Sequence, residues 1–256
     1  MMHLLFAALL LVGQTPVAPI SAKDVKVTPK PVAEFEMSKL RGVIRRLSWN
    51  ADATLLYLQT AELRNDALPK ELFHYTLDPK SGDLKKLDAE PAWSVDYSQW
   101  KLGQSAPGEP TLKIEVASET RRNAATSLPM AGEMARGGGV DPTGGASAES
   151  VMAAAQQSQS GTANLMRLKG QIVGEWLNQP IVPGQSFGWG PLGTAAIAYA
   201  EPNNRQLVIM DKSGERKKIS DTKGVYAPAF TADATKLAWI EVRGKKATLV
   251  IGDVSK

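Results

Sequence analysis

The sequence contains no cysteine and only two histidines, His3 and His74. Without cysteine the chain can form no disulfide and carry no lipid-modified cysteine, and a zinc site of the usual Cys/His type has no ligands to draw on. No acidic run with the spacing of a calcium-binding loop is present either. The composition therefore predicts neither a metal nor a cofactor.

Excess charge of one sign is also scarce. The 30 basic and 26 acidic residues leave a formal net charge of only +4. The basic residues occur as scattered pairs, such as Arg45-Arg46 and Lys245-Lys246, whereas a nucleic-acid surface needs basic side chains gathered on one element. We expect a solvated surface and no nucleic-acid partner, around the sizeable core that 43% hydrophobic residues allow.

Only one apolar run, residues 4–12, has the look of a targeting segment, and it is too short to span a membrane. Its length suits the core of a secretory signal, and small residues follow at Ala18 and Ala22. The absence of Lys or Arg before the run leaves a buried N-terminal strand or helix as the alternative. We predict a leader over residues 1–22, cleaved near Ala18 or Ala22, and hence a periplasmic or secreted protein with no transmembrane segment after cleavage.

Internal repeats are the most informative pattern that is present. The string NADATLLYL at 50–58 reappears as TADATKLAWI at 231–240. A different string, DPKSGDLKKL at 78–87, reappears as DKSGERKKI at 211–219. Two unrelated shared strings favour internal duplication over chance.

The repeat has a period of about 42 residues. Aromatic residues at the equivalent position lie 44, 96 and 41 residues apart, at Trp49, Trp93, Trp189 and Phe230. Apolar strands begin at Leu72, Leu112, Leu165, Leu207 and Leu249. Units of this length with three or four short strands predict an all-β chain, a β-propeller of about five degenerate four-stranded blades, with four blades plus a long insertion as the alternative.

The residues around these aromatics suggest a family. PAWSVD at 91–96 and PAFTAD at 228–233 share the order aromatic, Ser/Thr, any residue, Asp, and a strand ending in Asp before a Gly turn follows later in the unit. This order resembles the TolB-type β-propeller repeats of exported bacterial proteins. Such repeats usually have Gly after the Asp, where Ala53, Tyr97 and Ala234 stand here. The blades are therefore degenerate copies, and no ligand site is transferred from the family.

Two enzyme motifs overlap within residues 184–211. G-x-S-x-G at Ser186 could be a hydrolase nucleophile elbow, but the usual downstream histidine is missing because His74 precedes it. G-x-G-x-x-G could be a dinucleotide-binding turn, with its residues at Gly188, Gly190, Gly193 and Asp211. Both motifs need a following helix, which 202–204 (PNN) would stop early. We predict a turn between strands and no catalytic residue, so that the protein is not an enzyme.

Other candidate side chains also favour structural roles. His74 lies on the polar side of a strand whose other face is Phe73, Tyr75 and Leu77. The aspartates at equivalent turns are expected to cap those turns in separate blades, at Asp52, Asp96 and Asp233. Large rings fill tapering gaps between blades, which predicts wedges at Trp49, Trp93, Trp189 and Trp239.

One segment, residues 121–161, lacks strand residues and is rich in Gly, Ala, Ser and Gln. We predict a low-complexity insertion in the propeller domain of residues 23–256, either disordered or a docking arm. Residues 24–37 have no blade of their own, so we also predict that their strand pairs with the last blade and closes the ring, with a flexible leader as the alternative.

Function is less determined than fold. The expected role is that of a non-catalytic protein-binding or scaffold module in the cell envelope. The alternatives are an accessory or gating domain of a periplasmic hydrolase, and a glycan or peptidoglycan binder that uses exposed aromatics such as Trp100 and Trp176. The sequence names no partner-binding residue, and its partner is expected to be another envelope protein or a cell-wall glycan.

Overall fold

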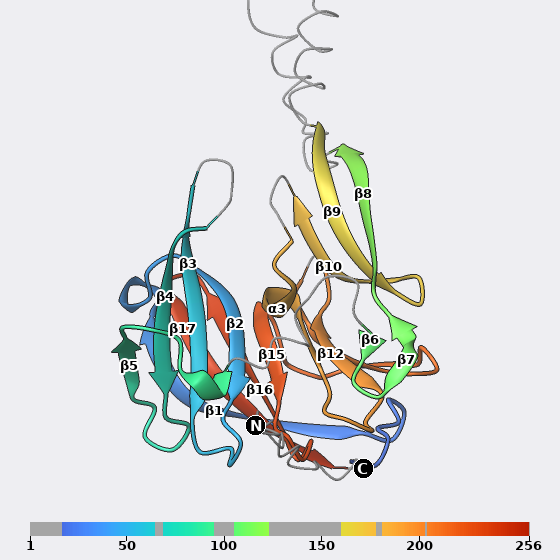
Figure 1. Cartoon of the computed structure of the whole chain (residues 1–256), viewed down its shortest axis with the longest axis horizontal. Coiled ribbons are helices and arrows are strands. Elements are labelled where there is room, and N and C mark those ends of the chain that lie inside the picture. Colours follow the sequence, from blue (N-terminus) through green and yellow to red (C-terminus); the bar gives the residue numbers. More distant parts are fainter. Residues whose placement is uncertain are drawn as a thin grey trace, which may run out of the picture.

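The computed structural model describes residues 17–64, 69–94, 105–122, 160–177, 181–202 and 204–255. These residues form almost only antiparallel strands, arranged as the four blades of a β-propeller (Figure 1). The fold class is therefore confirmed, in its four-bladed form.

Each blade is an antiparallel sheet. The first contains β2 (Val43–Trp49), β3 (Leu56–Leu63), β4 (Pro69–Leu77) and β5 (Leu84–Leu87). The second contains β8 (Glu115–Arg122), β9 (Ser160–Leu168) and β10 (Gln171–Leu177), next to the small pair β6 (Ser105–Ala106) and β7 (Glu109–Lys113). The third contains β11 (Phe187–Trp189), β12 (Ala196–Ala200), β13 (Leu207–Asp211) and β14 (Arg216–Lys218). The fourth contains β15 (Val225–Phe230), β16 (Lys236–Arg243), β17 (Lys246–Ser255) and β1 (Lys26–Glu36). Among the described residues there are also three short helices, η1 (Met37–Lys39), η2 (Ala92–Ser94) and α3 (Pro183–Ser186).

The strands that were expected to form a fifth blade lie in or beside the second blade. All five predicted strand starts lie in strands, but Leu112 of β7 packs in the same apolar cluster as Met166 and Leu168 of β9, the strand that contains Leu165. The predicted insertion begins and ends in paired strand, because Arg121 pairs with Gly161 and Arg122 with Ser160. Residues 123–159, and with them the choice between disorder and a docking arm, lie outside the described residues.

The ring is closed by β1, as predicted from residues 24–37. β1 pairs with β17 from Lys26 opposite Ser255 to Glu36 opposite Lys246. β1 is the edge strand of the fourth blade, a position that tolerates Pro29 and Pro31 because an outward-facing edge needs no N–H donors. Closure thus joins the two ends of the described chain in one sheet.

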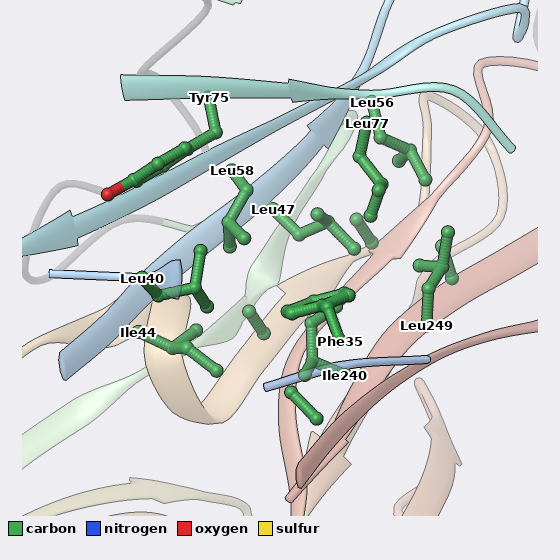
Figure 2. Packing of buried hydrophobic residues seen from close by; sticks show 14 of the residues in the cluster. Phe35, Leu40, Ile44, Leu47, Leu56, Leu58, Tyr75, Leu77, Ile240 and Leu249 are labelled. Carbon is green, nitrogen blue, oxygen red and sulfur yellow. The ribbon is translucent and has the colours of Figure 1, made fainter. Parts of the chain in front are cut away.

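Three apolar clusters hold the blades together. The first lies between the first and fourth blades, where Leu47 and Leu58 face Phe35, Ile240 and Leu249 (Figure 2). The second joins the third and fourth blades around Trp239, and the third joins the second and third blades around Trp176 and Trp189. Each fully buried aliphatic or aromatic side chain contributes about 1.5–3 kcal/mol, so these interfaces dominate stability.

Residues 17–25, which include a turn closed by the Val25 N–H donating to the Ser21 carbonyl, precede β1 and pack on the third and fourth blades. Ile20, Ala22 and Val25 are 3%, 0% and 1% exposed. The Ile20 N–H donates to the Thr194 carbonyl over 3.0 Å, and the Ala22 N–H donates to Asp211 Oδ2 over 2.9 Å. Part of the predicted leader therefore contacts the folded domain.

Candidate functional site

The inner strands of three blades converge on one cavity. β2, β11 and β15 lie beside one another and point their C-terminal ends the same way. Those ends line a cavity of about 400 Å³, here called the tryptophan cavity. It is lined by residues 47–51, 93–94, 107, 188–189, 191–192 and 229–232. Its lining therefore comes from the first, third and fourth blades, from η2 and from the turn between β6 and β7.

The four aromatic repeat positions all line this cavity. Trp49, Trp189 and Phe230 end β2, β11 and β15, whereas Trp93 lies in η2. Trp93 is 37% exposed and meets the Tyr57 ring edge-on, with centroids 6.3 Å apart. The signal was present in the sequence, because one position repeated in blades around an axis must converge on that axis.

The prediction of wedges between blades is confirmed for three of the four tryptophans. Trp239 is fully buried between the third and fourth blades, and Trp189 is 2% exposed in the cluster of the second and third. Trp49 is partly buried, packs against the cluster of the first and fourth blades, and donates from Nε1 to the Ala229 carbonyl of the fourth blade over 3.0 Å. Trp49 and Trp93 thus present ring surface to the cavity.

Charge is missing from the described lining of the tryptophan cavity, where no residue is Asp, Glu, Lys, Arg or His. Its polar side chains already have partners. Asn50 Oδ1 accepts from the Thr54 and Leu55 N–H groups, and Thr231 Oγ1 donates to Asp233 and accepts from the Lys236 N–H. The cavity therefore offers ring faces and few unused hydrogen-bonding side chains.

A second cavity, here called the arginine cavity, lies at the opposite end of the inner strands. It also measures about 400 Å³ and is lined by residues 37, 42–44, 175–177, 185, 205, 226 and 242. Gln185 of α3 joins the blades here, because its Nε2 donates to the Ile44 carbonyl over 2.9 Å and its Oε1 accepts from Trp176 Nε1 over 3.1 Å. The two cavities thus mark the two ends of the propeller axis.

Arg205 gives the arginine cavity its distinctive chemistry. Its backbone has a left-handed φ of 50°, and its guanidinium lies 3.8 Å from the Tyr226 ring centroid. Nε donates to the Val225 carbonyl over 2.8 Å and Nη2 to the Gln185 carbonyl over 3.1 Å. Burial lowers the pKa of Arg205 from its ordinary value, against the opposing effect of Tyr226. The side chain is therefore fixed in place and partly desolvated.

The predicted turn caps are confirmed at two of three aspartates. Asp52 Oδ1 accepts from the N–H and the hydroxyl of Thr54, and Asp233 Oδ1 accepts from those of Thr235. The Thr54 hydroxyl and N–H lower the pKa of Asp52 below its usual value. Asp96 lies outside the described residues.

Neither enzyme motif has the structure that its chemistry needs. Ser186 ends α3, is 1% exposed, and is followed directly by strand β11. Gly188 lies in β11, where a Cβ atom would stand 2.1 Å from the Pro228 carbonyl oxygen. That glycine lets two inner strands approach each other. Asp211 caps its own turn by accepting from the Ser213 and Glu215 N–H groups.

His74 and Trp176 have structural partners in the first blade and in the second and third blades, and Trp176 is not exposed as glycan binding would require. His74 faces away from the apolar cluster that contains Phe73, Tyr75 and Leu77, as predicted, and its Nδ1 is hydrogen-bonded to the Tyr57 hydroxyl over 2.6 Å. Trp176 was expected to be exposed, but it is 3% exposed because it fills the cluster between the second and third blades. Trp100 lies outside the described residues.

The part of the chain that the structure describes contains no group of three or more His, Asp or Glu side chains placed to hold a metal ion. Within the same residues, no helix has the length and apolar character needed to cross a membrane.

Comparison with known structures gives weak likenesses to other propellers. TolB from Acinetobacter baumannii matches at 10% identity over 84% of this chain and 43% of its own, with a TM-score of 0.28. Oligogalacturonate lyase from Vibrio parahaemolyticus matches at 11% identity over 81% of this chain and 64% of its own, with a TM-score of 0.26. The Cps50 (Swd1) β-propeller domain of Myceliophteria thermophila matches at 10% identity over 93% and 96% of the two chains, with a TM-score of 0.26.

Two of the matched structures are thus TolB proteins. The chain spans less than half the length of the Acinetobacter TolB. No family model and no curated protein matches the chain. TM-scores this low add nothing about function, and the propeller fold rests on the sheet topology.

Proposed function

We propose that the protein is a non-catalytic binding module of the cell envelope that holds a segment of a partner protein in the tryptophan cavity. The observation that carries the proposal is the lining of this cavity, which combines four aromatic rings with no charged or titratable side chain among the described residues. General acid–base and nucleophilic catalysis need such groups next to the substrate, whereas apolar recognition needs ring surface.

A protein ligand fits this lining better than a glycan does. Sugar hydroxyls need donors and acceptors that are not already used, and those of Asn50, Ser94 and Thr231 are engaged within their own turns. Trp93 and Leu192, each 37% exposed, offer apolar surface instead. The expected ligand is an uncharged aromatic or aliphatic stretch of a partner.

Affinity capture from a native envelope extract tests this proposal. The wild-type chain should retain a defined partner, and Trp93→Ala and Leu192→Asp should each weaken its binding at least about tenfold, or 1.4 kcal/mol. Leu177→Asp, at an equally exposed leucine of the other cavity, is the control and should bind normally.

Titration of the same variants with chitotetraose and maltotetraose covers the glycan alternative. If wild type binds a neutral oligosaccharide and Trp93→Ala abolishes this binding, the ligand of the tryptophan cavity is a glycan and not a protein segment. Retention of a hydrolase whose activity the propeller alters would instead favour a gating role. Capture that is equal for wild type and Trp93→Ala would overturn the site.

Export belongs to the same proposal, and the packing of residues 17–25 sharpens the expected cleavage position. Cleavage after Ala22 would remove the buried Ile20 and Ala22 and the hydrogen bond to Asp211. Cleavage near Ala18 keeps all three. N-terminal sequencing of the native protein should therefore find a start at or before Pro19, and a start at Lys23 would contradict this assignment.

A further inference from the structure

Exposed apolar side chains gather at both ends of the axis. Six large hydrophobic residues are exposed among those described, and four of them line the two cavities. Trp93 and Leu192 line the tryptophan cavity, while Val43 and Leu177 line the arginine cavity at 39% and 38% exposure. Exposed apolar surface gathered at a cavity is typical of an interaction site.

The surface around the arginine cavity extends across the first blade. Val43 in β2 pairs with Ala61 in β3, and Ala61 pairs with Leu72 in β4, which is 42% exposed. Ala61 itself is buried, so the exposed apolar surface of this row is supplied by Val43, at the cavity, and by Leu72. An extended segment laid along this row would bring one end to Arg205.

We propose that the arginine cavity is a second interaction surface, which docks an extended partner segment carrying an aliphatic side chain next to a single carboxylate. The aliphatic side chain packs between Val43 and Leu177, and the carboxylate accepts from Arg205. This inference does not depend on the ligand of the tryptophan cavity, because the two surfaces share no lining residue.

The positive charge of the Arg205 guanidinium indicates that the ligand carries a carboxylate. Nε and Nη2 of Arg205 hold two backbone carbonyls, and no described residue accepts a hydrogen bond from Nη1. Guanidinium-to-carboxylate hydrogen bonds are among the strongest in proteins and strengthen where water is partly excluded. The left-handed backbone of Arg205 is a strained conformation for a residue with a Cβ, and here that conformation aims the guanidinium at the cavity.

Glu175 limits the ligand to one carboxylate. It lines the same cavity as Arg205, so the site presents both signs of charge. A polyanion such as a nucleic acid would bring repelling charges close to Glu175, whereas one carboxylate on an apolar segment need not. The site therefore suits a peptide and not a phosphate-rich polymer.

An array of acetylated, C-terminally amidated octapeptides probed with the purified full chain tests the inference. Bound peptides should be enriched in Leu, Val, Ile or Met beside one Asp or Glu. Replacing that acid with its amide should weaken binding about tenfold or more. Absence of any such enrichment would overturn the proposal.

Variants of the protein then locate the binding. Leu177→Asp and Arg205→Gln should each reduce affinity at least tenfold, and Leu192→Asp, at the other end of the axis, should leave it unchanged. Arg205→Lys separates charge from geometry, because it keeps the charge but loses the fork and should restore affinity only in part. Leu177→Asp keeps the test valid if Arg205→Gln fails to fold, since Leu177 is a surface residue.

Every outcome decides between the two sites. Binding that is lost in Leu192→Asp but kept in Leu177→Asp would assign the peptides to the tryptophan cavity and overturn this proposal alone. Binding indifferent to both variants would overturn it as well. Failure of envelope capture by the tryptophan cavity would leave the octapeptide result unaffected.

Discussion

The two faces of the first blade are built from the same strands and are stabilised in different ways. One face presents Leu47, Leu58 and Leu77 to the fourth blade in an apolar cluster. The other face holds Arg46, which is 4% exposed, donates to the Ser94 carbonyl over 3.0 Å and forms an ion pair with Glu90. Because side chains alternate along a strand, neighbouring residues enter these two environments in turn.

The comparison teaches that the propeller is not equally closed at all its interfaces. Apolar clusters of described residues join three pairs of neighbouring blades, and none of them joins the first blade to the second. There the first blade presents hydrogen bonds among Tyr57, Gln59 and His74. Apolar packing tolerates small shifts, whereas a buried polar network fails when one partner is lost.

Removing residues 24–37 should have the largest effect, because it uncovers the apolar face. The truncation removes β1 and Phe35 and opens the edge of β17. Loss of a buried Phe alone costs about 3–5 kcal/mol, so the melting temperature should fall by about 10 °C or more and oligomers should appear. Thermal unfolding with size-exclusion chromatography measures both. An unaltered melting temperature, with fast hydrogen exchange at Val25 and Val27, would show that the segment is only a tether.

Arg46→Met tests the polar face with a single substitution. It should cost about 3–5 kcal/mol in the free energy of unfolding, because it leaves the Glu90 carboxylate without its ion-pair partner in a mostly buried setting. Urea denaturation gives the value. The double variant Arg46→Met/Glu90→Met should recover much of the loss, and a double variant as unstable as the single one would argue against this origin.

Leu58→Ala is the matched test of the apolar face. The fully buried Leu58 should cost about 2–5 kcal/mol by leaving a cavity. Unlike Arg46→Met, it leaves no polar partner unsatisfied, so a second substitution at a neighbouring residue should not rescue it. If Glu90→Met restored the stability of Leu58→Ala, the two faces of the first blade would not be stabilised in different ways.

Two buried tyrosines give a finer comparison. Tyr57→Phe removes a hydroxyl that both His74 and Gln59 contact, and it should cost about 1–2 kcal/mol. Tyr75→Phe on the other face removes one acceptor of the Arg41 N–H and should cost about 0.5–1 kcal/mol. If the two variants lose equal free energy of unfolding in urea denaturation, the hydrogen bonds of the polar face do not depend on one another more than those of the apolar face.

The smallest expected effects lie in the repeat turns. Ala53 and Ala234 follow the capping aspartates with left-handed φ values of 56° and 58°. Ala53→Gly and Ala234→Gly should each stabilise the protein by about 0.5–1 kcal/mol, because glycine adopts this conformation without strain. A destabilisation in either variant, measured by calorimetry, would show that the alanine methyl group contributes packing that outweighs the strain.

The sequence predicted the features that depend on internal repeats and on the alternation of apolar and polar residues along strands. The shared strings around Asp52 and Asp233 located equivalent turns, and the unpaired segment before Met37 predicted β1 on β17. The count of five blades included a separate unit at Leu112, which lies in the small β6–β7 pair beside the second blade. The tryptophan cavity was missed as a site because its repeated aromatic residues were interpreted as wedges between blades. The arginine cavity was missed because its residues come from distant positions and meet only after the ring closes. Arg205 carries no sequence signal, because its left-handed backbone and its carbonyl partners belong to the fold.

The pairing of β1 with β17 has a kinetic consequence. Lys26 must find Ser255, so the last contact of the ring joins residues near opposite ends of the chain. Contacts between such distant residues are slow to form, since the entropy of closing the intervening loop is lost before the contact is gained. The fourth blade cannot be completed until the C-terminal strand has been synthesised. A nascent chain of this design therefore stays open until β17 has left the ribosome, and its apolar inter-blade faces stay uncovered for that time.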